Sequence, residues 1–197
     1  MNTARRTVAP LLLGLVLLTG TTACSTGPAP DPGATAPPRP TTAPAPSADP
    51  TDTGWLQLMI PMDEGAVALL DLAARKASDP VLRSFSARLR TAQEAELAAL
   101  RGLRGRMGLP DTDVHEGHEM PGMVTARDLE RARAAEGAAF DRLLVTEIGD
   151  HLRQSARVSR SQTTAGSSAE AKERATALVA AREDQLAELA ELPGAQG

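Results

Sequence analysis

Between residues 55 and 193, apolar side chains recur at every third or fourth position in several long segments. This spacing places them on one face of an α-helix, where a neighbouring helix can bury them. Signals for β-strands are scarce, because the chain has no Tyr, one Trp, two Phe and few runs of β-branched residues. We therefore expect an all-α fold.

Turn signals divide this region into four long helices and one short helix. The sequence SDP at 78–80 separates the first two long helices, and Gly108 ends the second. The short helix begins at Thr125, and the sequence AGSS at 165–168 separates the last two long helices. Residues 55–193 are therefore predicted to form a four-helix bundle, with the short extra helix in its longer crossover.

The two halves of the predicted bundle resemble each other. The sequence AQEAELAAL at 92–100 matches AREDQLAEL at 181–189, and MIPMD at 59–63 matches EIGDH at 147–151. Helices rich in Ala, Leu and Glu often look alike, but here the order and the lengths of the segments also agree. The pattern indicates a bundle built from two similar helical hairpins.

Asp63 and His151 occupy matching positions in the two halves, and both lie on apolar stripes. A lone carboxylate or imidazole in the bundle interior would be costly to remove from water. We therefore predict that they face each other, with the carboxylate accepting a hydrogen bond from the imidazole and raising its pKa. The alternative is a metal site in the bundle, formed by these two residues with Met59 and Met62.

The segment DVHEGHEMPGM at 113–123 holds two of the three histidines and two of the six methionines of the chain. His115, His118, Met120 and Met123 supply imidazole and thioether groups, which suit Cu(I), and imidazole also suits Cu(II). The spacing alone favours a solvated loop, with a methionine packed on the bundle, over a copper site.

Residues 1–23 have the pattern of a secretory signal peptide, with two arginines, an apolar run too short to span a bilayer, and small residues. Cys24, the only cysteine, follows TGTTA and resembles the lipidated cysteine of a bacterial lipobox. A lipid on Cys24 would anchor the protein to the outer face of the cell membrane, outside the cytoplasm. With one cysteine, neither a disulfide framework nor a thiolate metal site is expected.

Residues 24–54 are rich in Pro, Ala, Thr, Ser and Gly, and nine of them are prolines. Such a composition cannot bury enough apolar surface to offset the entropy lost on ordering. We therefore predict a disordered, extended tether between the membrane and the bundle. Thr51, Asp52 and Thr53 at its end are candidate caps for the first helix.

Charge and motif content argue against two classes of function. The formal net charge of −4 becomes −6 when the signal peptide and its two arginines are removed, and no basic stripe remains, so no nucleic acid partner is expected. A ferritin-type di-iron centre needs a Glu-x-x-His motif on each of two helices, but Glu147 precedes His151 by four residues and no second motif exists. We expect no enzymatic activity, and the sequence indicates no particular protein partner.

Four segments resemble, in order and spacing, the motifs of the DUF305 family: MIPMDEGA at 59–66, AQEAELAAL at 92–100, HEMPGM at 118–123 and AAFDRLLVTEIGDH at 138–151. The resemblance implies a ferritin-like four-helix bundle. Some members of that family are linked to copper binding or copper resistance outside the cytoplasm.

The chain departs from the family at the two His-His pairs that the first and last of these motifs contain. Met62 and Asp63 stand at the first pair, and Asp150 replaces one histidine of the second. The resemblance therefore implies a cell-surface lipoprotein that binds or buffers copper weakly through the loop. The alternative is a metal-free structural or protein-interaction module that has lost the metal site of the family.

Overall fold

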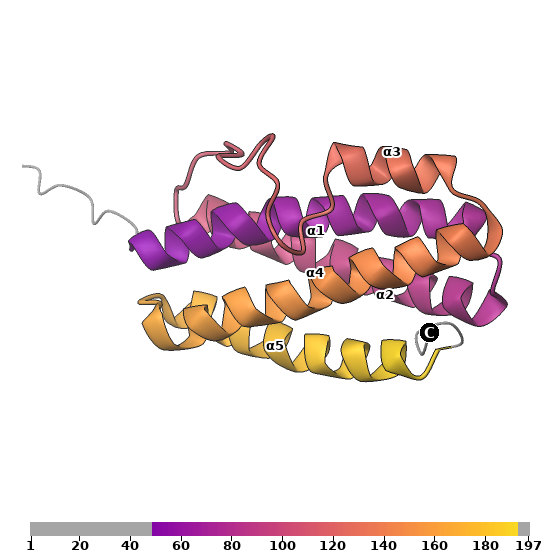
Figure 1. Ribbon diagram of the computed structural model, residues 1–197. Helices are drawn as coiled ribbons and strands as arrows, with labels where there is room; N and C mark the ends of the chain where they lie inside the picture. The colour runs from indigo at the N-terminus through magenta and orange to yellow at the C-terminus, as the bar shows by residue number, and fades with distance from the viewer. Residues whose placement is uncertain (1–48, 193–197) are drawn as a thin grey trace, which may run out of the picture. The chain divides into compact units, whose positions relative to one another are not determined.

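The computed structural model describes residues 49–192 of the chain. Over this range it contains five α-helices and no β-strand, which confirms the all-α prediction (Figure 1). The helices are α1 (Pro50–Lys76), α2 (Pro80–Arg106), α3 (Ala126–Ala134), α4 (Gly137–Ala165) and α5 (Ala169–Ala190). The predicted signal peptide, the lipidated Cys24 and the tether up to residue 48 lie outside the described residues.

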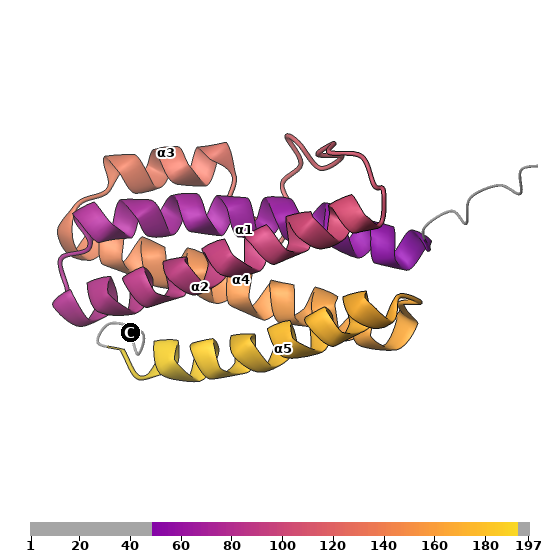
Figure 2. The same cartoon turned by 180° about the vertical axis from the view of Figure 1, so that it is seen from behind.

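The four long helices form a bundle of two helical hairpins. α1 packs along α2, α4 packs along α5, and contacts between α1 and α4 join the hairpins (Figure 1 and Figure 2). The short α3 lies in the crossover between α2 and α4 and packs on α1. This arrangement confirms the predicted bundle. Among the helices of residues 49–192, none is both long enough and apolar enough to cross a lipid bilayer.

The helix ends follow the predicted capping signals. Asp79 caps α2, because its carboxylate accepts hydrogen bonds from two backbone N–H groups at 2.7 and 2.9 Å, and Pro80 occupies the first turn. Thr125 caps α3 in a reciprocal capping box with Asp128. The short polar turns between helices therefore form where the sequence predicts them.

The predicted tether over 24–54 is too long at its end, because α1 begins at Pro50. Asp49 caps this helix, and the predicted caps at 51–53 lie inside its first turn. An Asp-Pro pair starts α1 just as an Asp-Pro pair starts α2, since proline at the first helical position has no N–H to leave unpaired. The Pro-rich composition on the N-terminal side masks this signal in the sequence.

Two apolar clusters fill the bundle, and polar side chains separate them along the long helices. One cluster contains the first half of the α1 stripe and the end of α2, and the other contains the second half of α1 and the start of α2. Between them lies a set of residues that we call the polar layer: Asp63 on α1, Gln93 and Glu96 on α2, His151 and Ser155 on α4, and Arg182 on α5. Because burying polar groups is costly, a layer of them inside the bundle marks a candidate functional site.

Candidate functional site

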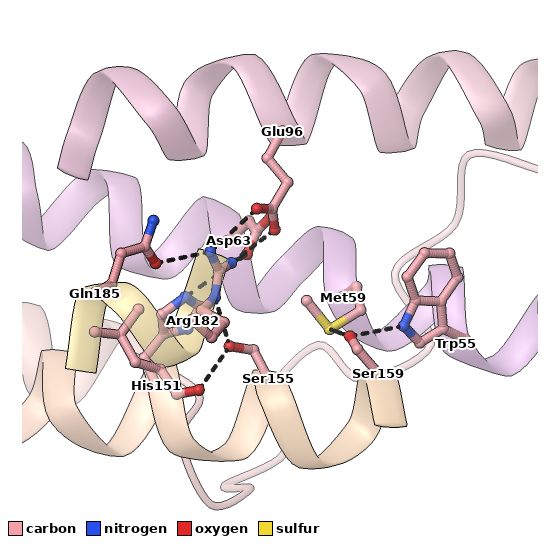
Figure 3. A network of polar contacts seen from close by, with 10 residues as sticks. Trp55, Met59, Asp63, Glu96, His151, Ser155, Ser159, Arg182 and Gln185 are labelled. Carbon is pink, nitrogen blue, oxygen red and sulfur yellow. Dashed lines mark hydrogen bonds and ion pairs between the residues drawn. The ribbon is translucent and has the colours of Figure 1, made fainter. Parts of the chain in front are cut away.

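Asp63 and His151 face each other in the bundle interior, as predicted. Both side chains are fully buried, and His151 Nε2 lies 3.7 Å from Asp63 Oδ1 (Figure 3). This distance is longer than a hydrogen bond, and neither ring nitrogen of His151 has a hydrogen-bond partner within residues 49–192. The predicted proximity is therefore confirmed, whereas the predicted hydrogen bond is wrong.

The partner of Asp63 is Arg182, which extends from α5 into the polar layer and is itself fully buried. Its guanidinium donates to both carboxylate oxygens of Glu96, with Nη2–Oε1 at 2.6 Å and Nη1–Oε2 at 3.1 Å (Figure 3). Nη2 also donates to Asp63 Oδ1 at 3.2 Å, and Nε donates to Ser155 Oγ at 2.9 Å. Four helices thus converge on one buried cation, in the bidentate geometry that arginine favours with carboxylates.

Sequence reasoning missed Arg182 and Glu96, although both carry a positional signal. Arg182 lies four residues after Leu178 and four before Leu186, so it continues the apolar stripe of α5. Glu96 falls in the segment of α2 that matches this part of α5. A charged residue at a stripe position is buried only when it is paired, so the two signals taken together could have predicted the ion pair.

The surroundings of His151 favour a neutral imidazole. Burial lowers its pKa to about 3, and the positive charge of Arg182 acts in the same direction, while the backbone of Gly122 opposes the shift weakly. The prediction that Asp63 raises this pKa is therefore wrong. The physical reason is that loss of hydration penalises the charged ring, and the nearby guanidinium of Arg182 repels it.

The pKa of Asp63 is shifted in the opposite direction, upwards. Burial, followed by the nearby charge of Glu96, raises the pKa of Asp63 well above its usual value, while Arg182 acts against this shift. The guanidinium therefore offsets only part of the cost of charging Asp63. It stands between the two carboxyl groups in a region that is mostly closed to water.

All four residues of the candidate bundle metal site, Met59, Met62, Asp63 and His151, are buried in the bundle. Met59 and Met62 are buried in one apolar cluster, and Met59 Sδ accepts a hydrogen bond from Ser159 Oγ at 3.8 Å (Figure 3). Within residues 49–192, no group of three or more His, Cys, Asp or Glu side chains is arranged to hold a metal ion. The cation in the polar layer is a guanidinium.

The loop between α2 and α3 brings the other two histidines together. The rings of His115 and His118 lie edge to face, with their centroids 6.2 Å apart and their planes at 66°. A backbone hydrogen bond of 2.9 Å from His118 N–H to His115 C=O closes the turn between them. Both line an open cavity of about 420 Å³, whose wall also includes Met123 and Glu64.

The two methionines of the loop are placed differently. Met123 lines the cavity of the two histidines and also packs against an apolar cluster of the bundle. Met120 instead lines a neighbouring cavity with Arg127 and Arg131, and it does not line the cavity of the histidines. Met123 lines both cavities. The structure therefore groups His115, His118 and Met123 around the first cavity and places Met120 outside it, on the far side of Met123.

Two glycines hold the end of this loop against the bundle. A Cβ atom on Gly65 of α1 would lie 2.4 Å from the carbonyl oxygen of Val124. A Cβ atom on Gly122 would lie 2.5 Å from Gln154 Cβ and 2.8 Å from the carbonyl oxygen of Asp150, both on α4. The loop backbone therefore packs closely on α1 and α4 only because both side chains are absent, and this contact fixes Met123 beside the histidines.

We expect Gly122→Ala to lower the free energy of unfolding by about 2–3 kcal/mol, because it combines an unfavourable positive φ with a steric clash against α4. Gly122 has φ +74°. Gly117→Ala is the matched control, since Gly117 has φ +77° but open space around its Cβ position, and it should cost about 1 kcal/mol. Urea unfolding of both variants measures the difference, and equal losses would contradict close packing of the loop.

Comparison with known proteins agrees with this architecture. The model of the DUF305 family, a domain of unknown function, matches residues 52–193. A crystal structure of a DUF305 protein of Streptomyces coelicolor, described as a candidate secreted protein, is similar with a TM-score of 0.64 and 17% identity, over 72% of this chain and 90% of that chain. A DUF305 fragment from Deinococcus radiodurans has a TM-score of 0.66 and 16% identity, over 73% and 95% of the two chains. A comparison with curated proteins found no match.

Proposed function

Because the chain belongs to the DUF305 family, we propose that it is an extracytoplasmic lipoprotein that binds copper through the loop between α2 and α3. The predicted signal peptide and the lipobox-like Cys24 support a location on the outer face of the membrane. The secreted character ascribed to the similar Streptomyces protein is in keeping with this location. The role proposed is binding or buffering of the ion, without catalysis.

The observation that carries this proposal is the grouping of His115, His118 and Met123 around one open cavity. Two imidazoles and one thioether form a donor set that suits Cu(I), and no thiolate is needed. His118 is exposed and His115 is partly exposed, so an ion can reach the rings from solvent. The turn between the histidines and the glycine contacts of the loop reduce the entropy lost when the ligands close on an ion.

The proposal is tested by Cu(I) titration of the purified protein under reducing conditions, in competition with a chromogenic Cu(I) chelator. We expect one bound ion, and a gain of about 2.7 kcal/mol in unfolding free energy when free Cu(I) exceeds the dissociation constant about 100-fold. The variant His115→Ala/His118→Ala/Met123→Leu should lose both effects. Met120→Leu is the matched control and should keep them, because Met120 lines a different cavity.

Two outcomes would contradict the loop site. If the triple variant binds Cu(I) as the parent does, the ligands lie elsewhere, and Met59, Met62, Asp63 and His151 become the candidates. If neither protein responds to copper, the metal-free alternative remains, namely an anchored structural or protein-interaction module.

A further inference from the structure

The proposed function leaves the buried ionic groups of the bundle unexplained. Asp63 from α1, Glu96 from α2 and His151 from α4 meet in the interior, close to Arg182 from α5 (Figure 3). Asp63, His151 and Arg182 are fully buried, and the Glu96 side chain is 14% exposed. A layer of this kind is expensive to build, and hydrophobic side chains of similar volume would often serve stability as well or better.

Asp63, Glu96 and His151 carry groups that bind metal ions, although in the structure, with Arg182 between them, they are not arranged around a common ion position. Two carboxylates and one imidazole suit divalent ions such as Zn²⁺, Mn²⁺ or Co²⁺. Asp63 Oδ2 and both ring nitrogens of His151 have no hydrogen-bond partner within residues 49–192. A neutral imidazole has one unprotonated nitrogen, and that nitrogen can coordinate an ion. The set comes from three different helices, which the fold holds in place.

The guanidinium occupies the position where such an ion would neutralise the carboxylates. It donates two hydrogen bonds to Glu96, and its Nη2 atom donates another to Asp63 Oδ1 at 3.2 Å. A second positive charge a few ångströms away would meet strong repulsion, because water does not screen charges in the interior. The same repulsion contributes to the lowered pKa of His151.

We infer that Arg182 is the resident cation of the bundle interior: it takes the place of a metal ion, and its removal converts the polar layer into a divalent metal site. The native interior therefore excludes metal ions, although it contains three side chains able to bind one. This inference does not depend on the copper proposal, because it concerns the interior and not the loop.

The test uses Co²⁺ as the probe, in a background carrying His115→Ala/His118→Ala so that the loop imidazoles cannot bind it. In this background, adding Arg182→Ala should make the melting temperature rise by about 5–10 °C when Co²⁺ exceeds its dissociation constant about 100-fold. Visible absorption of Co²⁺ should appear at one equivalent and disappear when His151→Leu is added. Millimolar guanidinium ion should restore stability at the same cavity in the absence of metal.

The matched controls keep the cation in place. The background alone, and the background with Arg182→Lys, should show neither the thermal shift nor the absorption. An equal response in the background alone would overturn the inference, because the interior would then accept metal beside Arg182. If Arg182→Ala is unfolded without metal, refolding on addition of Co²⁺ or guanidinium, followed by circular dichroism, supports the inference, and failure of both to refold it overturns it.

Discussion

Arg182→Met should lower the free energy of unfolding by about 3–5 kcal/mol, because it leaves two carboxylates in the bundle interior without their cation. Methionine keeps most of the apolar volume of the side chain, so the loss measures mainly the missing charge and hydrogen bonds. The guanidinium makes polar contacts of 2.6–3.2 Å with Asp63, Glu96 and Ser155, and each of these acceptors would lose a buried donor. Urea unfolding at neutral pH measures the effect.

Two comparisons separate the buried charge from ordinary surface electrostatics. Arg160→Met removes an arginine whose ion pair with Glu183 has a similar distance of 2.7 Å, but both side chains are more than half exposed, so the loss should stay below about 1 kcal/mol. The triple variant Arg182→Met/Asp63→Asn/Glu96→Gln has no buried charge and should regain much of the loss. A loss for Arg182→Met no larger than that for Arg160→Met would contradict the view that Arg182 neutralises the interior.

The bundle could be predicted because the sequence signals that define each helix lie within the helix itself or at its ends. An apolar stripe with a period of 3.6 residues, together with an Asp-Pro or Thr-x-x-Asp start signal, determines a helix and its ends without reference to the rest of the chain. The one misplaced boundary, the start of α1 at Pro50, carries the same Asp-Pro signal as α2. There, the composition of the preceding segment outweighed the local signal.

The site was predicted less completely, because it depends on how four helices are rotated against one another. Asp63 and His151 could be paired, since both interrupt apolar stripes at matching positions of the two halves. Arg182 interrupts a stripe in the same way, but arginine is so common on helix surfaces that its position alone does not indicate burial. The hydrogen bond predicted for His151 fails for this reason, because Asp63 contacts the arginine instead.

The position of the loop could not be read from the sequence at all. It depends on Gly65 and Gly122, where the absence of a side chain lets the backbone of one segment approach another. A glycine inside a helix or a turn does not indicate which segment approaches it. The donor atoms of the loop were therefore visible in the sequence, whereas the position of Met120 outside the cavity of the histidines was not.

The pH dependence of stability should show a large contribution from His151. Its pKa is about 3 in the folded protein, against about 6.5 in an unfolded chain. As the pH falls below about 6.5, the unfolded chain binds a proton that the buried ring does not, so the folded state loses about 1.4 kcal/mol per pH unit. The stability is fully present above pH 6.5, and about 4–5 kcal/mol of it should be lost as the pH approaches 3.

The variant His151→Gln isolates this contribution, because glutamine keeps a polar side chain that cannot titrate. The contribution of Asp63 to the pH dependence has the opposite sign, because a group with a raised pKa loses its contribution to stability as the pH rises. Asp63 is present in both proteins, so its contribution largely cancels when their stabilities are compared. Urea unfolding between pH 7 and 4 should therefore show the parent losing stability relative to the variant. NMR provides the direct measurement: the His151 ring signals, assigned by their absence in the variant, should not shift between pH 8 and 4. A transition near or above pH 6.5 would instead mean that Asp63 binds a charged imidazole, and that the guanidinium of Arg182 does not dominate the interior.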